Sequence, residues 1–320
     1  MTQILVELRS AVRPFLAPLE AGDRVIVAVS GGADSLALAG ALFAESKDLL
    51  ITCIGVTIDH QLQNGSAEQA EKVVQQLQTI GFTDIISEKV NVDQSNGLES
   101  GARDARYEAL NRIANEKKAV QIYLGHTKDD QAETVLLGLA RGSGARSLSG
   151  MAAVNGKLIR PFLTVTRAMT EQGCKDLGLE VWNDPHNLNA EFSRVRIRTR
   201  VLPVMEEEIG PGMTDALVRS ASLLRDDADA LDEMAADAAH GRDLSDLDIE
   251  FLETLPKAVR TRLIRMAIYA QGAPAGSLTA DHVSAVEALV TSWRGQGEVS
   301  LPGGVKVARI SGRLSAYARS

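Results

Sequence analysis

Hydrophobic residues in the first half of the chain follow two alternating patterns. Short runs rich in valine and isoleucine predict strands, and longer segments with apolar residues three or four positions apart predict helices. The expected strands span residues 24–29, 51–58, 84–88, 120–124 and 158–160, and the expected helices span 35–47, 66–81, 98–118 and 129–140. This alternation predicts a doubly wound, mostly parallel α/β sheet with helices on both faces.

After about residue 165 the helical pattern dominates. Helices are expected over 167–177, from about 195, and over 213–240, 256–270 and 279–292. The stretch 206–212 mixes charge with Gly and Pro and is the best candidate for a domain boundary. A Pro-Gly-Gly turn at 302–304 between two β-like runs predicts a closing hairpin. We therefore expect a first domain over 1–210 and a smaller, mainly helical domain over 211–320.

Polar segments directly follow three of the expected strands, at residues 30–35, 59–60 and 125–130. Ligands of such sheets bind beyond the carboxyl ends of the strands. We therefore expect these three segments to converge on one edge of the sheet and to form the functional site there.

Composition narrows the class of protein. The chain has 320 residues, of which 45% are hydrophobic and 24% charged, as in ordinary globular proteins. Its apolar runs are all well short of the ~20 residues that a membrane span needs, and Glu7 and Arg9 interrupt the N-terminal stretch, unlike a signal peptide. Cys53 and Cys174 are too few for a zinc or iron–sulfur site and are typical of reduced thiols. A cytoplasmic protein without membrane contact is expected.

Charge is distributed unevenly along the chain. The net charge of −8 argues against a nucleic-acid partner, since phosphate contacts need Lys and Arg. However, acids concentrate at 226–248, and a basic segment covers 257–265. Four further arginines have no acid among them: Arg194, Arg196, Arg198 and Arg200. A basic path on an acidic body therefore leaves an RNA partner open.

The most informative segment is a glycine-rich loop at residues 30–35, which reads Ser30-Gly31-Gly32-Ala33-Asp34-Ser35. It joins a strand to a helix, so its backbone N–H groups lie at a helix N-terminus that favours anions. The loop lacks the Lys of a Walker A motif and the glycine spacing of a dinucleotide fingerprint. The alternative interpretation is an ordinary strand-to-helix turn in which Gly gives clearance and Asp or Ser caps the helix.

A second segment carries candidate chemistry at 125–134, Gly-His-Thr-Lys-Asp-Asp-Gln-Ala-Glu-Thr, and is followed by Arg-Gly-Ser-Gly at 141–144. Asp130 and Glu133 are three residues apart and share a helix face. Carboxylates there can hold Mg²⁺ or position an amine, or they can simply cap the helix. His126 taken alone is more typical of a structural histidine.

A third segment, 97–107, places Arg103 and Arg106 on one face of a helix, as a clamp for phosphate or carboxylate requires. The alternative is a solvated face with Tyr107 packed on the core.

Together these segments resemble the tRNA(Ile)-lysidine synthase family, within the N-type ATP pyrophosphatases. The loop at 30–35 is similar to the family's pyrophosphate loop, and 125–144 to its His-x-x-Asp-Asp-Gln-x-Glu-Thr and Arg-Gly-Ser-Gly block. Other similar segments are 97–107, 158–163, 183–187, 192–198, 202–203 and 301–304. Three residues depart from the family pattern: Thr127 replaces a usual second His, Gln63 a frequent Arg, and Val195 an Asn. The resemblance is strong over residues 24–205.

The resemblance implies an ATP-dependent carbon–nitrogen ligase that uses ATP, Mg²⁺, L-lysine and the isoleucine tRNA with a CAU anticodon. The C2 oxygen of the wobble cytidine would attack the α-phosphate of ATP and release pyrophosphate. The ε-amine of lysine would then displace AMP and leave lysidine. Residues 1–210 would be the catalytic domain and residues 211–320 the domain that binds tRNA.

The resemblance also implies roles for individual residues. The backbone of Ser30, Gly31, Gly32, Ala33, Asp34 and Ser35 would bind the pyrophosphate. Asp34 would help hold Mg²⁺, and Asp130 and Glu133 would orient or deprotonate the lysine amine. Arg103 and Arg106 would steady ATP or the lysine carboxylate, and His126 would face the nucleotide. The tRNA would be gripped by Arg194, Arg196, Arg198 and Arg200.

Two other functions remain open from the sequence. A tRNA thiolase would share the fold, although such enzymes generally use cysteine pairs, and Cys53 and Cys174 lie far apart in the sequence. A nucleotide- or RNA-binding module without catalysis would not need Asp34, Asp130 and Glu133 together. The oligomeric state, including a homodimer, is also open.

Overall fold

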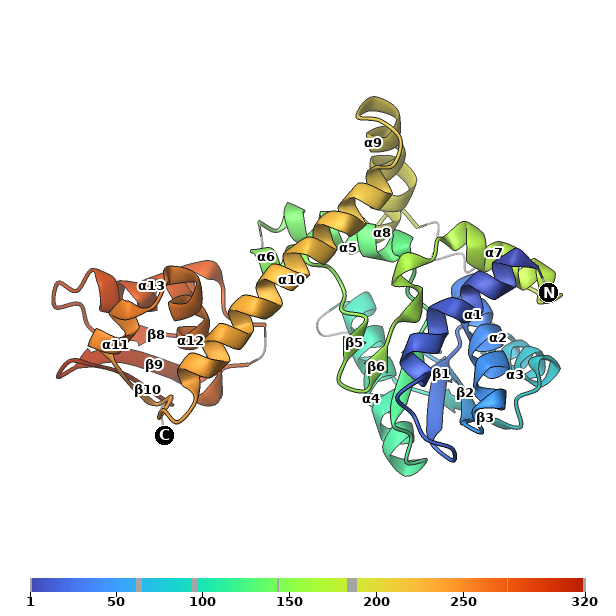
Figure 1. Ribbon diagram of the computed structural model, residues 1–320, viewed down its shortest axis with the longest axis horizontal. Helices are drawn as coiled ribbons and strands as arrows, with labels where there is room; N and C mark the ends of the chain where they lie inside the picture. The colour runs from blue at the N-terminus through green and yellow to red at the C-terminus, as the bar shows by residue number, and fades with distance from the viewer. Residues whose placement is uncertain are drawn as a thin grey trace. The chain divides into compact units, whose positions relative to one another are not determined.

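A computed structural model describes residues 2–61, 65–93, 97–142, 144–182, 189–274 and 276–318 (Figure 1). Three places with predicted family motifs lie outside the described residues: Gln63, Ser143 and the segment 183–187. The chain forms two compact units. The first unit comprises Met1–Gly142 and Gly150–Ala221, and the second comprises Ser143–Ser149 and Ser222–Ser320.

The first unit contains a six-stranded sheet in the order β3-β2-β1-β4-β6-β5. The strands are β1 (Arg24–Ala28), β2 (Thr52–Asp59), β3 (Asp84–Lys89), β4 (Gln121–Leu124), β5 (Val154–Asn155) and β6 (Leu158–Ile159). All neighbouring strands are parallel except β5 and β6, which are antiparallel. The predicted, mostly parallel α/β sheet is confirmed. β5 was not predicted, because its two residues are exposed and belong to no apolar run.

Helices cover both faces of this sheet. They are α1 (Gln3–Leu16), α2 (Ala33–Asp48), α3 (Ser66–Ile80), α4 (Leu98–Glu116) and α7 (Arg167–Asp176). Helix α5 (Lys128–Ala140) follows β4 and packs on other helical segments. Alternate residues of β1 point to opposite faces. Val25 and Val27 therefore join a core shared with α1, α2 and α7, whereas Ile26 packs with Leu110 and Ile113 of α4. Burial on both faces explains why the strand reads as a continuous apolar run.

The order of the strands places the site. From β1 the chain moves outward to β2 and β3, then returns to the other side of β1 to form β4. The loops after β1 and β4 therefore leave neighbouring strands at the point where the strand order reverses. In open α/β sheets the ligand crevice lies there, at the carboxyl ends of the strands.

The first unit also contains a short 3₁₀ turn directly before α7 and three helical segments after it. These are η1 (Pro161–Thr164), α8 (Ser193–Arg196), a π-helical turn η3 (Ile197–Val201) and α9 (Leu202–Glu208). Ile197 and Leu202 are both buried in one apolar cluster with Ala132 and Leu136 of α5. The wider π turn lets residues five apart share a face, which a regular α-helix does not allow.

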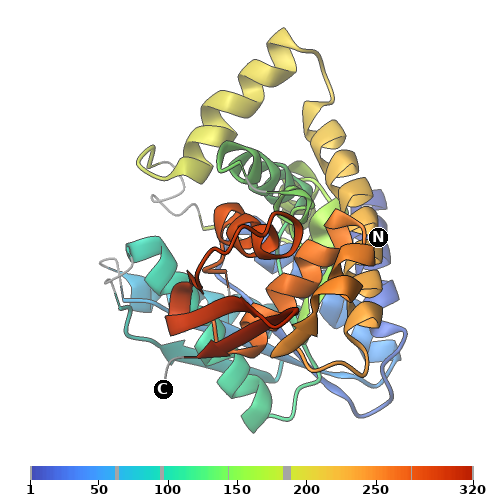
Figure 2. The ribbon, with the colours of Figure 1, turned by 90° about the vertical axis from the view of Figure 1, so that its left-hand side faces the viewer.

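The second unit contains helices on a four-stranded antiparallel sheet of order β7-β10-β9-β8 (Figure 2). Its elements are α6 (Ala145–Leu148), α11 (Ile249–Thr254), α12 (Lys257–Ala270), α13 (Ala280–Thr291), β7 (Asp246–Asp248), β8 (Val299–Ser300), η4 (Pro302–Gly304), β9 (Val305–Ile310) and β10 (Arg313–Ala318). The predicted turn at 302–304 joins the antiparallel strands β8 and β9, so that hairpin is confirmed. The sheet is larger than predicted, since β7 and β10 extend it.

Helix α10 (Met213–Ala239) begins directly after the Gly210–Gly212 stretch and contributes residues to both units. A domain boundary at 210/211 therefore stays a prediction. Within the part of the chain that the structure describes, no helix combines the length and apolar character needed to cross a membrane.

Candidate active site

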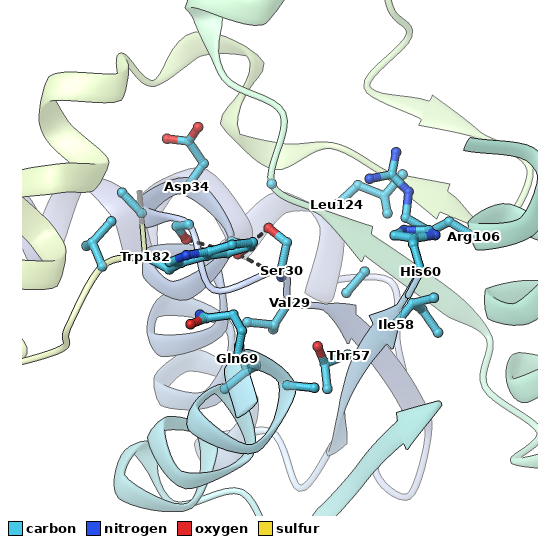
Figure 3. Close-up of a pocket in the computed structure, with 18 of the residues that line it drawn as sticks. Val29, Ser30, Asp34, Thr57, Ile58, His60, Gln69, Arg106, Leu124 and Trp182 are labelled. Atoms are coloured by element: carbon cyan, nitrogen blue, oxygen red, sulfur yellow. Dashed lines mark hydrogen bonds between the residues drawn. The ribbon is translucent and has the colours of Figure 1, made fainter. Parts of the chain in front are cut away.

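A cavity of about 700 Å³ opens in the first unit at the carboxyl ends of β1, β2 and β4 (Figure 3). The three segments expected to converge, 30–35, 59–60 and 125–130, all contribute to its wall. In Figure 3, Trp182 and Gln69 lie beside Ser30, whereas His60 and Arg106 lie on the other side of the cavity. The predicted convergence of these segments is therefore observed.

The phosphate loop, residues 30–35, is held tightly between α2 and α3. Gly31 has φ +88°, and a Cβ atom there would lie 2.7 Å from Gln69 Nε2 and 3.0 Å from Val73 Cγ2. Its carbonyl accepts a hydrogen bond from the backbone N–H of Trp182 at 3.0 Å. Gly31 is thus required both by its conformation and by its surroundings.

The start of α2 lacks a side-chain cap. Its N-cap is Gly32, which has no side chain to accept the N–H groups of the first turn. Ser35 Oγ instead accepts from the N–H of Ser30 at 3.1 Å and donates to the carbonyl of Gly32 at 3.0 Å, which fixes the shape of the loop. A helix N-terminus with unpaired N–H groups at a cavity is a binding site for a phosphate group.

Gly125, which follows β4, packs directly on this helix start. A Cβ atom at Gly125 would lie 2.9 Å from both the N and Cα atoms of Ser35, and these backbone atoms cannot move independently.

We expect Gly125→Ala to displace the loop and weaken ATP binding about tenfold or more, since overpacking a rigid contact costs ~1–3 kcal/mol. Calorimetric titration with ATP and Mg²⁺ measures this. Gly297→Ala, where a Cβ atom meets nothing within 4 Å, is the control, and equal affinities for both variants would contradict the prediction.

Asp34, in the first turn of α2, is bound by two residues of α7. Thr170 Oγ1 donates to Asp34 Oδ1, and Arg167 Nε lies 3.4 Å from Asp34 Oδ2. Burial raises the pKa of Asp34 above its ordinary value, against the opposing charge of Arg167. No cluster of three metal-ligating side chains exists among the described residues. Mg²⁺, however, is commonly held by one carboxylate together with substrate phosphates, and Asp34 beside the phosphate loop fits that role.

Asp130 and Glu133 share one face of α5, as predicted, and both contact arginines. Arg167 Nη2 donates to Asp130 Oδ1 at 3.0 Å, and Arg198 Nε donates to Glu133 Oε1 at 2.7 Å. Asp130 also closes a capping box with Thr127, whose N–H donates to Asp130 Oδ2 at 2.8 Å. The capping and the functional interpretations of this segment are therefore compatible, since one carboxylate oxygen caps the helix and the other faces Arg167.

The two carboxyl groups differ in their tendency to bind a proton. Burial favours protonation of Asp130, but the charge of Arg167 and the N–H of Thr127 hold its pKa below the ordinary value. Burial raises the pKa of Glu133, whose side chain is 0% exposed, despite its bond with Arg198. Asp130 is thus the ionised group in the cavity wall, and Glu133 is the stronger proton acceptor behind it.

Polar atoms without partners lie on the other side of the cavity. Arg106 Nε, His60 Nδ1 and His126 Nδ1 are buried and make no hydrogen bond in the described structure. Burial lowers the pKa of Arg106 and of both histidines, that of His126 to about 4. A buried cation whose donor lacks a partner is costly, so these atoms fit an anionic ligand that is absent from the protein alone.

The low pKa of His126 makes stability depend on pH. Between its ordinary value near 6.5 and about 4, the unfolded chain binds a proton at His126 and the folded chain does not. The free energy of unfolding should therefore fall as the pH drops through this range, by on the order of 3 kcal/mol from this residue. His126→Asn should show the shallower pH dependence. Urea unfolding at several pH values, followed by Trp182 fluorescence in a Trp293→Phe chain, measures this dependence. Equal slopes of unfolding free energy against pH, with and without His126→Asn, would contradict the prediction.

The remaining predicted residues are dispersed. Arg103 is exposed on α4, with its guanidinium 5.5 Å from the centre of the Tyr107 ring, and does not line the cavity. Arg194 lies 3.9 Å from Glu133 and Arg198 contacts it directly. Arg196 donates to the carbonyls of its own segment, and Arg200 is exposed.

Two cavity residues, Arg167 and Trp182, were missed from the sequence, as was Thr170, which is buried and bonds to Asp34. Arg167 contacts Asp34 across a separation of 133 residues, and no local pattern signals such a contact. The two cysteines are buried, and each donates to a single oxygen, of Ser46 and of Ala33 respectively.

Comparisons with known proteins agree with this arrangement. Residues 4–205 match the family of PP-loop domains, and residues 247–315 match the TilS substrate binding domain. A tRNA(Ile)-lysidine synthase of Thermobifida fusca is 50% identical over 309 residues, which is 96% of this chain and 95% of the relative. The chain belongs to the tRNA(Ile)-lysidine synthase family. The member from Streptomyces coelicolor is also 50% identical, over 91% of this chain and 84% of its own length.

Among solved structures, a U34-tRNA thiolase from Methanococcus maripaludis with its [4Fe-4S] cluster is similar, with a TM-score of 0.59 and 20% identity over 69% of this chain and 80% of that chain. At this identity the similarity concerns the fold alone. Membership of the tRNA(Ile)-lysidine synthase family confirms the family predicted from the sequence motifs, whereas the roles of single residues stay predictions.

Proposed function

We propose that this protein ligates L-lysine to the C2 position of the wobble cytidine in the isoleucine tRNA with a CAU anticodon. The observation that carries the proposal is a single cavity that joins an uncapped phosphate loop to the carboxylates of α5. Its relatives bear the name tRNA(Ile)-lysidine synthase at 43–50% identity over most of their length. ATP chemistry is assigned to residues 1–210 and tRNA binding mainly to residues 211–320.

The first half-reaction would activate the cytidine. The cytidine C2 oxygen attacks the α-phosphorus of ATP, the bond to the β-phosphate oxygen breaks, and pyrophosphate leaves. The N–H groups at the start of α2 would hold the charge that develops on pyrophosphate, and Arg106 would pair with the phosphates. Asp34 would hold Mg²⁺, which neutralises phosphate charge when bound. Burial keeps His60 and His126 neutral at physiological pH, so they would add no charge to this pocket.

The second half-reaction would place lysine at α5. The ε-amine attacks C2 of the adenylated cytidine, and AMP leaves with the C2 oxygen. Asp130, ionised and in the cavity wall, would orient the amine. Glu133 has the raised pKa and would accept the proton that the amine loses. Arg198 contacts both acids, which supports a role in this amine site in place of tRNA binding.

The tRNA must present an unstacked cytidine, since proteins read single-stranded loops by displaying their bases. Exposed Arg200 is the arginine of segment 194–200 whose position best supports a contact with the tRNA backbone. Arg194 and Arg196 would contact the tRNA after the anticodon loop is bound. A cytoplasmic location and a homodimer are consistent with this function, but the proposed reaction depends on neither.

The direct test mixes the purified protein with ATP, Mg²⁺, radiolabelled L-lysine and a transcript of that tRNA. Label should enter the tRNA, with AMP and pyrophosphate released in equal amounts. A transcript with the wobble cytidine replaced by uridine, and a reaction without ATP, should remain unlabelled. If the complete mixture leaves the tRNA unlabelled, the proposal fails, and transfer of sulfur to the same tRNA would favour a thiolase.

A further inference from the structure

One arginine contacts the carboxylates that the proposed function assigns to Mg²⁺ and to the lysine amine. The guanidinium of Arg167 contacts Asp34 at 3.4 Å, Asp130 at 3.0 Å and Glu133 at 3.9 Å. Asp34 is the proposed partner of Mg²⁺, and Asp130 is the proposed partner of the lysine amine. Each of these cations would compete with the Arg167 guanidinium for its carboxylate.

Only the side chain of Arg167 is free to leave. Its backbone N–H donates to Asp129 Oδ2 at 2.9 Å, and Thr166 caps the helix that begins at Arg167. The guanidinium lies in the cavity wall with 22% of the side chain exposed. An anchored backbone with a partly exposed cation at its end allows a change of partner without movement of the helix.

The charges around Arg167 favour such a change. Three acids, Asp34, Asp130 and Glu133, face three arginines, Arg167, Arg194 and Arg198. An additional cation in this balanced cluster would compete with a guanidinium for its carboxylate, and the phosphates of ATP would offer that guanidinium another anionic partner. The planar guanidinium fork binds phosphate oxygens as well as it binds carboxylates.

We propose that Arg167 exchanges the carboxylates of Asp34 and Asp130 for the phosphates of ATP, which frees Asp34 for Mg²⁺ and Asp130 for lysine. This inference rests on the proposed function and assigns Arg167 as a residue that couples the two halves of the site. Because lysine must compete with Arg167 for Asp130 when ATP is absent, ATP should strengthen lysine binding, and lysine should strengthen ATP binding by the same factor.

The test measures the two affinities separately and together. α,β-Methylene-ATP with Mg²⁺, in which the bond to be broken is blocked, is titrated by calorimetry, and radiolabelled lysine binding is followed by equilibrium dialysis with and without it. In the unaltered protein the analogue should tighten lysine binding about tenfold. In Arg167→Gln the analogue should bind about 10- to 100-fold more weakly, and lysine alone should bind as tightly as before or more tightly, with the coupling lost.

Two further variants complete the design. Arg167→Lys keeps the positive charge that the three acids need and loses the fork, so its affinity for the analogue should be intermediate. It carries the test if Arg167→Gln does not fold. Arg112→Gln removes an arginine that is 49% exposed on α4 and should change neither affinity.

Three outcomes would overturn the inference: an Arg167 variant with unaltered analogue affinity, an unaltered protein without coupling, or Arg167→Gln binding lysine more weakly when nucleotide is absent. The last would make Arg167 a direct lysine ligand. If the unaltered protein does not bind the analogue at all, the proposed function fails together with the inference, whereas each of the other results leaves that function standing.

Discussion

Asp130→Asn should lower lysine transfer to tRNA by about 10²- to 10⁴-fold while release of pyrophosphate continues. Asp130 is ionised because Arg167 and the N–H of Thr127 hold its pKa down, against the effect of burial. An amide of the same shape keeps its oxygen for the capping box but loses the charge that attracts an ammonium group. The amine would therefore be poorly placed for attack, although the adenylated cytidine still forms.

Measuring the two products separately tests this expectation. Pyrophosphate release and labelled lysine in tRNA are followed in the same reaction. Asp48→Asn, which neutralises an exposed carboxylate at the far end of α2, should leave both unchanged. If Asp130→Asn lost both products equally, Asp130 would act with the metal and the nucleotide and would not be the amine site.

Asp34→Asn should instead abolish both products, with a loss of about 10²- to 10³-fold in pyrophosphate release. Asp34 lies in the first turn of the helix whose N-terminus forms the phosphate loop, where its charge can hold Mg²⁺ against the phosphates. Asparagine retains the hydrogen bond with Thr170, so the local fold should persist. Loss of the charge alone would then account for the defect.

The dependence on Mg²⁺ separates a metal role from a structural one. Asp34→Asn should need a higher Mg²⁺ concentration for half-maximal pyrophosphate release, whereas Asp130→Asn should not. Thermal unfolding in the absence of ligands should be similar for the two variants and the unaltered protein. An Asp34→Asn variant with an unshifted Mg²⁺ requirement would contradict the assignment of Asp34 to the metal.

Most of the fold was predictable because its signals are local. The strands β1, β2 and β4 are largely buried apolar runs, β3 contains a pair of isoleucines, and apolar residues recur about every 3.6 positions in the helices between them. Helix α1, residues 3–16, was not predicted, and it contains Pro14, a residue that disfavours a helix interior. The strand β7 was also missed, because its three residues are too few for any periodicity.

The site was predictable only where its residues form a continuous motif. The phosphate loop and the pair Asp130 and Glu133 are of this kind. Arg167 is not, since it begins a helix that looks ordinary in sequence and acquires meaning only when folding brings Asp34 and Asp130 to its guanidinium. The directions in which the arginines of segment 194–200 point were likewise not predictable, because they depend on a π turn that no sequence pattern indicated.

That π turn makes the segment sensitive to its length. Ile197 and Leu202 pack in one cluster while Arg198 between them reaches Glu133. With the π turn kept, one residue inserted or deleted in the helix beside it would rotate everything after that point by about 100° relative to everything before it. Either α9 would lose its packing or Arg198 would turn away from Glu133. Point substitutions in this segment can be tolerated one at a time, but insertions and deletions cannot, so its spacing is as much a part of the site as its side chains.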